Sequence, residues 1–490
     1  MLSGGEGAPE LALPGPARYG AVSMDYVSTR GSAPTLDFEG VTLAGLASDG
    51  GLYVPQQWPH FSPEAIAALR GLSYVETAVH VMAPFVGGSL TESELRLLCS
   101  QAYGRFSHAA VTPLVQLDER NWLLELFHGP TLAFKDVALQ LLGLLFERFL
   151  STRDTELTIV GATSGDTGSA AIDAVAGREK INIFMLHPEN RVSEVQRRQM
   201  TTVLAPNVHN IAIKGSFDDA QTIVKTLFND REFSARFNLS AVNSINWARL
   251  MAQVVYYFYA AVRLGSPDRP IAFSVPTGNF GDVFAGYVAA RCGLPVERLI
   301  VATNVNDILH RALTAGDYSA GTVTPTATPS MDIQVSSNFE RLLFDLVGRD
   351  GPALAKMMAM FEVTRTMSIP ADMLAGARPL FASARIDANG MSLAMRRASE
   401  KSGELIDPHT AIGLAAAHGS DIAADVPIVT LATAHPAKFR DAVERATGSR
   451  PSLPARIGSL FEREERCDTL PATTDAVRAY VAERAIPTGA

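Results

Sequence analysis

A lysine in an apolar setting is the first residue of this sequence that could do covalent chemistry. Lys135 lies in the segment ELFHGPTLAFKDVALQ beside Phe134 and Val137, and only seven of the 42 basic residues of the chain are lysines. Burial lowers the pKa of a lysine toward that of a neutral amine, the form that attacks a carbonyl carbon to make a Schiff base. The alternative is a structural lysine that reaches solvent along its stem or pairs with Asp136.

A second segment, PTGNFGD, has the composition of an anion-binding turn. It covers Pro276 to Asp282 between an apolar run and a helical pattern, so Gly278 and Gly281 would let backbone N–H groups approach a phosphate closely. The segment matches neither GxGxxG nor GxxxxGK[ST], which excludes the usual dinucleotide and nucleoside triphosphate fingerprints. A tight turn without a ligand is equally compatible with these residues.

A third segment, GATSGDTGSAA from Gly161 to Ala171, would suit a carboxylate. Thr163 and Ser164 supply hydroxyl groups, and the free N–H groups at a helix start attract negative charge. The same residue types are the ordinary N-caps of helices, so a capping cluster without a ligand is the alternative.

Short apolar runs that end in such turns predict a mainly parallel sheet. Leu157–Val160 precedes GATSGDTG, Ile271–Val275 precedes PTGNFGD, and Ile428–Leu431 precedes ATAHPAKF. Because strand–turn–helix units place their turns at the carboxyl ends of parallel strands, we expect the three turns to face one cleft. Helical spacing of apolar residues predicts an upstream helical region with three helices: Pro63–Leu69, Tyr74–Met82 and Glu92–Tyr103.

The composition predicts a globular protein with more than one domain. The chain has 490 residues, and 47% of them are hydrophobic. Its length exceeds the size at which single cores stop growing. A formal net charge of −9 without a basic run argues against nucleic-acid binding, and no apolar stretch reaches the roughly 20 residues that span a bilayer. Three widely spaced cysteines predict a reduced, cytoplasmic protein without a metal site. Residues 1–23 are rich in Gly, Ala and Pro, which predicts that they form a disordered extension.

Several motifs occur together in an order typical of one enzyme family. ELFHGPTLAFKDVALQ, TSGDTG, GNFGD and ATAHPAKF follow one another with the rough spacing seen in threonine synthases, and YVSTRG, LASDGGLYVP and SINWARLMAQVVYY resemble the bacterial and fungal subgroup. The resemblance extends from about Met24 to beyond Phe439. It implies a lyase of the fold type II pyridoxal-phosphate family, an α/β fold like that of the tryptophan synthase β chain.

The same resemblance implies a division of the chain into parts. We expect an N-terminal region at residues 24–110, a large cofactor domain made of 111–152 and 243–490, and a small α/β domain at 153–242. Both domains would contain parallel sheets.

Roles for individual residues also follow from the resemblance. Lys135 would be the catalytic residue and carry pyridoxal 5'-phosphate as a Schiff base. Thr433 would lie beside the pyridine nitrogen, and Asp166 near the 3'-hydroxyl, where related cysteine synthases have Asn. The cofactor phosphate would bind to the GNFGD turn: Gly278, Asn279, Phe280, Gly281 and Asp282. The substrate carboxylate would bind to the TSGDTG loop: Thr163, Ser164, Gly165 and Thr167.

The implied reaction is threonine biosynthesis from O-phospho-L-homoserine and water, with release of phosphate, by γ-elimination followed by addition of water at Cβ. Asn246 and Arg249 of the SINWAR segment would bind the leaving phosphate, while a structural ion pair is the alternative for Arg249. Two other functions stay open: a lyase on the same substrate that releases 2-oxobutyrate, and a non-catalytic binding module. The protein would act on this small molecule as a monomer or homodimer, without nucleic-acid or membrane partners.

Overall fold

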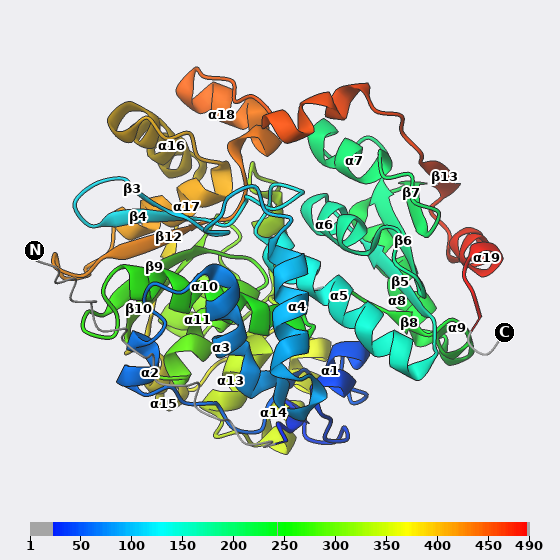
Figure 1. The fold of residues 1–490 in the computed structure, drawn as a ribbon, viewed down its shortest axis with the longest axis horizontal. Coiled ribbons are helices and arrows are strands. Elements are labelled where there is room, and N and C mark those ends of the chain that lie inside the picture. Colours follow the sequence, from blue (N-terminus) through cyan, green and yellow to red (C-terminus); the bar gives the residue numbers. More distant parts are fainter. Residues whose placement is uncertain (1–22, 243, 488–490) are drawn as a thin grey trace, which may run out of the picture.

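A six-stranded sheet forms the core of the larger of two α/β parts (Figure 1). The computed structural model describes residues 23–242 and 244–487. The strand order is β11-β10-β9-β12-β4-β3, and only β3 runs antiparallel to its neighbour among these strands. The strands are β3 (Leu114–Gln116), β4 (Asn121–Glu125), β9 (Ile271–Pro276), β10 (Val296–Thr303), β11 (Phe381–Arg385) and β12 (Ile428–Ala432).

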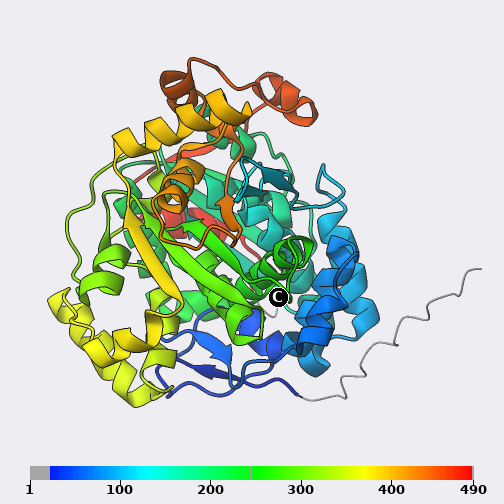
Figure 2. The ribbon, with the colours of Figure 1, turned by 90° about the vertical axis from the view of Figure 1, so that its left-hand side faces the viewer.

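A second, parallel sheet of five strands forms the smaller part, with the order β13-β7-β6-β5-β8. Figure 2 shows the larger sheet in front of the smaller one. The strands are β5 (Leu157–Ala162), β6 (Ile181–Pro188), β7 (Val208–Lys214), β8 (Leu239–Ser240) and β13 (Asp468–Pro471). The three strands predicted from apolar runs are therefore confirmed as β5, β9 and β12.

Helices cover both faces of the larger sheet because its strands are apolar on both sides. Ile428 belongs to the core cluster that includes α17 (Pro408–His418), whereas its neighbour Val429 belongs to the cluster that includes α10 (Trp247–Arg263). Successive side chains of a strand point to opposite faces, so a buried strand needs a helical layer on each. The other helices around this sheet are α11 (Gly281–Arg291), α12 (Ile308–Ala315), α13 (Phe339–Leu346), α14 (Gly351–Thr364), α15 (Ala371–Ala377), α16 (Ala388–Ser402) and α18 (Arg440–Thr447).

The smaller sheet has its own helices, and α5 (Lys135–Arg153) runs between the two parts (Figure 1). Within the described residues, no helix has both the length and the apolar composition needed to cross a membrane. The helices of the smaller part are α6 (Asp166–Val175), α7 (Glu194–Thr201), α8 (Phe217–Asn229), α9 (Arg231–Arg236) and α19 (Thr474–Arg484). Short 3-10 turns lie at Gly87–Ser89, Pro329–Met331, Pro436–Phe439 and Ala455–Glu462.

The N-terminal region is helical, as predicted, and also contains a short antiparallel strand pair that the sequence pattern did not indicate. Its elements are β1 (Tyr26–Ser28), α1 (Phe38–Ala44), β2 (Tyr53–Pro55), α2 (Pro63–Ala67), α3 (Tyr74–Val86) and α4 (Glu92–Tyr103). Together with the two parallel sheets, this region confirms the expected α/β fold class. The extension expected at residues 1–23 lies outside the described residues except for its last residue.

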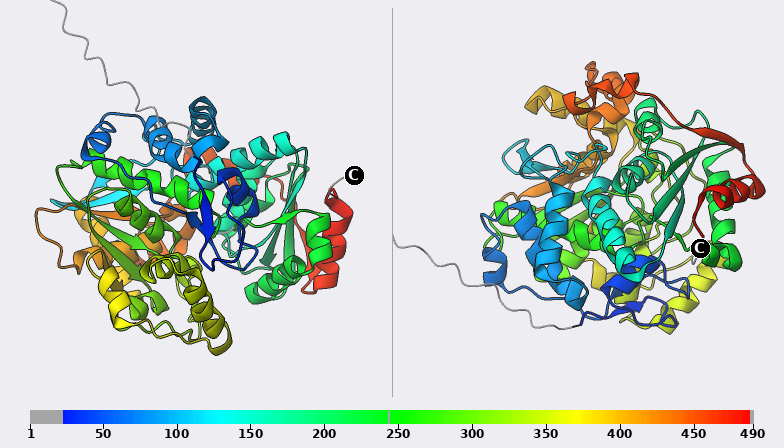
Figure 3. Two further views of the ribbon diagram at one scale, coloured as in Figure 1. Left: turned by 90° about the horizontal axis from the view of Figure 1, so that it is seen from below. Right: turned by 45° about the vertical axis from the view of Figure 1, so that its right-hand side comes forward.

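The C-terminal end differs from the expected division of the chain. Residues 243–490 were all expected in the large domain, but β13 pairs with β7 of the smaller sheet and α19 packs against α8 (Figure 3). The four residues of β13, DTLP, do not alternate between apolar and polar types, and most of their side chains are exposed. Its place is decided by a long-range pairing that the local sequence does not reveal.

A buried hydrogen-bond chain connects the N-terminal region to α10. The Tyr26 hydroxyl donates to the Phe85 carbonyl at 2.6 Å and accepts from Nε1 of Trp247, the first residue of α10, at 3.0 Å. All three residues are buried. These hydrogen bonds hold the start of α10, the helix that carries Arg249.

Replacing Tyr26 with Phe should lower stability by about 1–3 kcal/mol, because the substitution leaves the Trp247 N–H group without a partner in a dry core. The shift of the urea-unfolding midpoint measures the change. Tyr53→Phe is the matched control, since its hydroxyl makes one longer bond of 3.2 Å to the Pro34 carbonyl. An equal loss of stability in both variants would contradict the role of the Tyr26 hydrogen bonds.

Candidate functional site

Lys135 is the first residue of α5, and the segment before it pairs with the segment after β12. The Phe134 N–H group donates to the Thr433 carbonyl at 2.8 Å, and the His435 N–H group donates to the Leu132 carbonyl at 3.0 Å. Leu132 has a φ of 64°, which turns the chain into this pairing. Since β4 and β12 are neighbours in the larger sheet, the two loops that follow them bring Lys135 and Thr433 together.

The residue after Lys135 locks the preceding loop. The buried Asp136 carboxylate accepts hydrogen bonds from the N–H group and the hydroxyl of Thr131 at 2.7 and 2.6 Å. Gly129 packs so closely on this carboxylate that a Cβ atom there would collide with it. Burial raises the pKa of Asp136 to about 7, while the bonds from Thr131 oppose that rise. These contacts hold the loop before α5, which starts at Lys135.

The amine of Lys135 lies in a dry and mainly cationic environment. The residue is 9% exposed, and its Nζ atom lies 3.6 Å from Oδ2 of Asp166, a separation longer than a hydrogen bond. Burial lowers the pKa of Lys135; Asp166 opposes this effect, and the charges of Lys438 and Arg249 add to it. The pKa is lowered because burial and the charges of Lys438 and Arg249 outweigh the attraction of Asp166.

The GNFGD turn connects β9 to α11 and presents free backbone donors. Among the described residues, the N–H groups of Gly278, Asn279 and Gly281 have no hydrogen-bond partner. Phe280 has a φ of 63°, and a Cβ on Gly278 would lie 2.6 Å from the Ser330 carbonyl oxygen, so both positions shape the turn. Unpaired N–H groups at the N-terminus of an 11-residue helix fit a phosphate group.

The turn is held from behind by groups that are not in the motif. Asn338 donates to the Asn279 carbonyl from its backbone and its side chain, at 3.1 and 3.0 Å, and Ser336 donates to the Gly278 carbonyl at 2.8 Å. The peptide group between Gly278 and Asn279, whose carbonyl accepts from Ser336, leaves the Asn279 N–H group unpaired among the described residues, whereas the Phe280 N–H group donates to the Thr277 hydroxyl at 3.2 Å. The fully buried Arg341 donates to Asn338 and to the Tyr53 and Ile245 carbonyls, which joins the turn to the N-terminal region.

Asp282 faces the turn instead of a ligand. Its Oδ1 accepts from the Thr277 hydroxyl at 2.5 Å and from the Val283 N–H group at 2.9 Å. Burial raises its pKa to about 6, and these two bonds and the charge of Lys135 act against that rise. A carboxylate would repel a phosphate, so the side chain of Asp282 contributes structure to the turn.

The TSGDTG loop brings hydroxyls from the smaller sheet. The Thr163 hydroxyl accepts from the N–H groups of Gly165 and Gly168, at 3.0 and 2.9 Å, and so shapes the loop. The side chains of Ser164 and Thr167 make no hydrogen bond within the described part of the chain. Ser164 is exposed and Thr167 half-buried, so both hydroxyls are available to a bound carboxylate.

The two residues predicted from the SINWAR segment differ in availability. Asn246 is completely buried and caps α10: its side chain donates to the Thr42 carbonyl at 2.8 Å and accepts from the Ala248 N–H group at 3.0 Å. Arg249 donates to the Val242 carbonyl at 2.9 Å, but its Nε has no partner and no described carboxylate pairs with it. Burial lowers the pKa of Arg249 to about 10.

The hydroxyl group of Thr433 is also available to bind a ligand. The residue is 6% exposed, and its hydroxyl makes no hydrogen bond to the residues that the structure describes. A hydroxyl beside Lys135, free N–H groups on the GNFGD turn and a free amine together fit pyridoxal phosphate, which needs a partner for its ring nitrogen, its phosphate and its aldehyde.

Two residues of the site were missed by the sequence analysis. Lys438 and Gln196 both bind the Asp166 carboxylate, at 2.7 and 2.8 Å. Lys438 belongs to the ATAHPAKF segment, and the scarcity of lysine that pointed to Lys135 could have pointed to it as well. Gln196 carries no comparable sequence signal.

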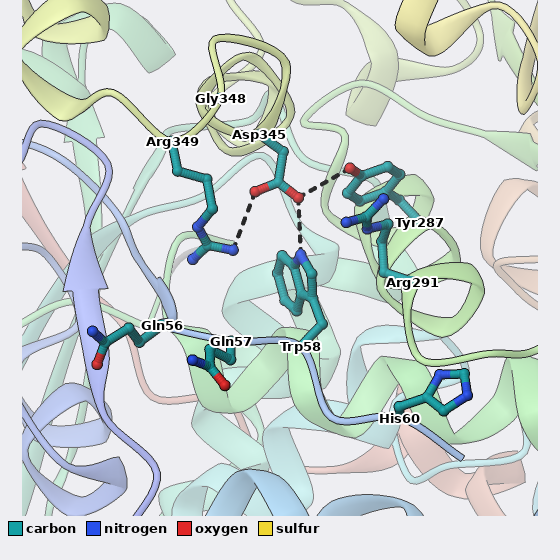
Figure 4. A pocket seen from close by; sticks show the side chains of 9 residues that line it. All are labelled: Gln56, Gln57, Trp58, His60, Tyr287, Arg291, Asp345, Gly348 and Arg349. Atoms are coloured by element: carbon teal, nitrogen blue, oxygen red, sulfur yellow. Dashed lines mark hydrogen bonds and ion pairs between the residues drawn. The ribbon is translucent and has the colours of Figure 1, made fainter. Parts of the chain in front are cut away.

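A surface pocket of about 570 Å³ lies apart from these groups (Figure 4). Asp345 binds the Trp58 indole at 2.9 Å and the Tyr287 hydroxyl at 3.0 Å there, and it also pairs with Arg349. The pocket lies at the far ends of α11 and α13, whose first turns contact the GNFGD turn. None of the predicted site residues lines it.

The lowered pKa of Lys135 predicts a measurable reactivity. In cofactor-free protein, Lys135 should react with acetic anhydride at lower pH than an ordinary lysine, because the neutral fraction of an amine rises as the pH passes its pKa. Quantitative peptide mass spectrometry across a pH series would give the half-point, with the exposed Lys225 as internal reference. A half-point for Lys135 above that of Lys225 would contradict the prediction.

Comparisons with known proteins identify the family of this chain. Three family models match successive parts of the chain: "Threonine synthase N terminus" at residues 25–103, "Pyridoxal-phosphate dependent enzyme" at 106–383 and "Threonine synthase, C-terminal" at 410–481.

Relatives and solved structures match over nearly the whole length. A threonine synthase of Pseudomonas aeruginosa is 55% identical over 94% of this chain and 98% of its own. The structure of PLP-bound threonine synthase from Brucella melitensis has a TM-score of 0.92 and 52% identity, and it covers 94% of this chain and 100% of that one. The yeast enzyme structure has a TM-score of 0.90 and 38% identity, covering 95% and 99%. This chain therefore belongs to the threonine synthase family of pyridoxal-phosphate-dependent enzymes.

Proposed function

We propose that this protein converts O-phospho-L-homoserine and water to L-threonine and phosphate. The observation that carries the proposal is a buried amine with a lowered pKa, Lys135, where the loops after β4 and β12 meet Asp166 of the smaller sheet. Pyridoxal phosphate is the cofactor of the family, and the 55% identical relative has the name of this activity. The lyase and the binding module named above are not favoured by these similarities.

The larger sheet would supply the cofactor contacts. Lys135 would bind the cofactor covalently through its amine, the N–H groups of Gly278, Asn279 and Gly281 would hold its phosphate, and the Thr433 hydroxyl would be a partner for its ring nitrogen. When bound, the cofactor withdraws electrons from the α carbon of the substrate, which no side chain in the site can do.

The smaller sheet would orient the substrate. The free hydroxyls of Ser164 and Thr167, with the N–H groups at the start of α6, suit the substrate carboxylate. Thr163 and Gly165 act indirectly by fixing the loop, because the Thr163 hydroxyl already binds two N–H groups and Gly165 packs tightly on Gln196.

Lys135 would also move the protons. Release of phosphate from Cγ requires proton removal from Cα and then from Cβ. The product needs one proton back at Cγ, which becomes the methyl group, and one at Cα, while water gives its hydroxyl group to Cβ and its remaining proton to the released phosphate. A neutral amine does both best when its pKa is near the working pH, which burial favours here. Burial of the site also limits the entry of water during elimination.

Arg249 would bind the phosphate that leaves. It is a buried guanidinium with an unpaired Nε and no carboxylate partner in the described residues, so a bound dianion would supply its missing counter-charge. Asn246 supports this role by capping the helix that carries Arg249.

We infer a cytoplasmic protein that acts on a small molecule as a monomer or homodimer. Cys99, Cys292 and Cys467 are free thiols, which suits a reducing compartment.

Covalent trapping tests the link to Lys135. Borohydride reduction of protein incubated with pyridoxal phosphate should attach the cofactor to the peptide that contains Lys135, and Lys135→Ala should remove the attachment. In a separate sample that is loaded with pyridoxal phosphate but not reduced, O-phospho-L-homoserine should give threonine and phosphate in equal amounts. Trapping with formation of 2-oxobutyrate and ammonia would support the lyase, and no trapping would support the binding module.

Arg249→Gln should raise the KM for O-phospho-L-homoserine at least tenfold, which corresponds to about 1.4 kcal/mol of lost binding, close to the lower end of the range of roughly 1.5–3 kcal/mol for a hydrogen bond to a charged group. Steady-state kinetics measure the change. Arg263→Gln, in the last turn of the same helix and exposed, is the control and should leave KM unchanged. An unchanged KM in Arg249→Gln would remove this residue from the phosphate site.

A further inference from the structure

Lys438 is a buried cation next to Lys135, and it has no role in the reaction steps proposed above. It lies in the 3-10 turn Pro436–Phe439, and its side chain is completely shielded from solvent. Its Nζ atom lies 2.7 Å from Oδ1 of Asp166 and donates to the Thr131 carbonyl at 2.8 Å. The same ammonium thus contacts the loop before Lys135 and the loop of the smaller sheet.

Asp166 has a different cation on each of its oxygens. Oδ1 accepts from Lys438 and from Gln196 at 2.8 Å, and Oδ2 faces Lys135 at 3.6 Å. Burial disfavours the ionised form of Asp166, but the charges of Lys438 and Lys135 hold its pKa well below the ordinary value. Lys438 has the shorter contact of the two lysines and is the principal counter-ion.

This geometry has a consequence for the charge balance of the site. Lys135 must be uncharged whenever it attacks a carbonyl or accepts a proton. At such times the pair of Lys438 and Asp166 is neutral by itself. Without Lys438, Asp166 would have Lys135 as its remaining cation and would stabilise the charged amine, because opposite charges in a dry site attract strongly.

We propose that Lys438 is a positioning residue that keeps the Asp166 carboxylate ionised and in place while Lys135 is uncharged. The inference deepens the proposed function, on which its role in catalysis rests. Lys438 does not bind the substrate phosphate, because its ammonium is enclosed and already directed to Asp166 and Thr131.

The contact also connects the two α/β parts. Asp166 and Gln196 belong to α6 and α7 of the smaller part, whereas Lys438 follows β12 of the larger sheet. Gln199 of α7 donates to the same Thr131 carbonyl at 3.0 Å. Lys438 therefore sets where the TSGDTG loop lies relative to Lys135.

The test measures the reactivity of Lys135 in cofactor-free protein, independently of the product formed. Lys438→Met should move the half-point of Lys135 acetylation to higher pH by about one unit or more, a tenfold fall in reactivity at fixed pH below the half-point. Lys438→Arg keeps the charge and should restore most of the wild-type profile. Lys180→Met is the control, since Lys180 pairs with Asp154 at the other end of α5, and it should change nothing.

The Asp166→Asn variant separates the effect of Lys438 that acts through Asp166 from direct repulsion between Lys438 and Lys135. Asp166→Asn alone should move the half-point of Lys135 to lower pH. In that background, Lys438→Met should produce at most half of the shift that it produces in wild-type protein. Equal shifts in both backgrounds, or no shift in either, would overturn the proposal.

Folding defects are distinguished from the electrostatic effect. Circular dichroism and thermal unfolding of each variant show whether it folds. If Lys438→Met does not fold, Lys438→Gln makes the same comparison with a neutral donor, and an unchanged profile in Lys438→Gln overturns the proposal. A protein that makes 2-oxobutyrate would contradict the proposed function while leaving the labelling result intact.

Discussion

Two buried ammonium groups share one buried carboxylate where the two sheets meet, and much of the surrounding structure keeps these charges dry and in register. An ion removed from water without a partner costs several kcal/mol, so Asp166 and Lys438 must stay together once the core closes over them. The pair leaves Lys135 with the longer contact to Asp166. A reactive amine can then lie in the core without being held in its charged form.

The loops that carry these charges depend on one another. The segment before Lys135 pairs with the segment that contains Thr433, and the Thr131 carbonyl receives bonds from Lys438 and Gln199. A change in any one of these contacts would move the others. This coupling explains why two α/β parts with separate sheets can form one site.

A division between supporting and available groups extends through the site. Thr163, Asp282 and Asn246 use their polar atoms to shape the turns in which they lie. Thr433 and the N–H groups of Gly278, Asn279 and Gly281 remain unpaired in the described structure. Buried polar groups normally find partners, so unpaired groups that gather around one buried amine fit a ligand-binding site.

The local sequence determined the parts of this protein that depend on neighbouring residues. Apolar runs followed by Gly- or Thr-containing turns identified β5, β9 and β12, and the setting of Lys135 indicated a reactive amine. These features are readable because strand formation, turn geometry and local burial are encoded over a few residues. The motif order then indicated the family, which the comparisons confirmed.

Only the tertiary structure decided which charges meet and which polar groups are already used. Nothing near Asp166 in the sequence reveals that Lys438 and Gln196 bind it, that Asn246 is consumed as a helix cap, or that β13 joins the smaller sheet. Each of these facts is a contact between residues far apart along the chain. Such contacts are selected by the packing of the whole fold, because burial brings distant groups together and then requires that their charges and hydrogen bonds be satisfied.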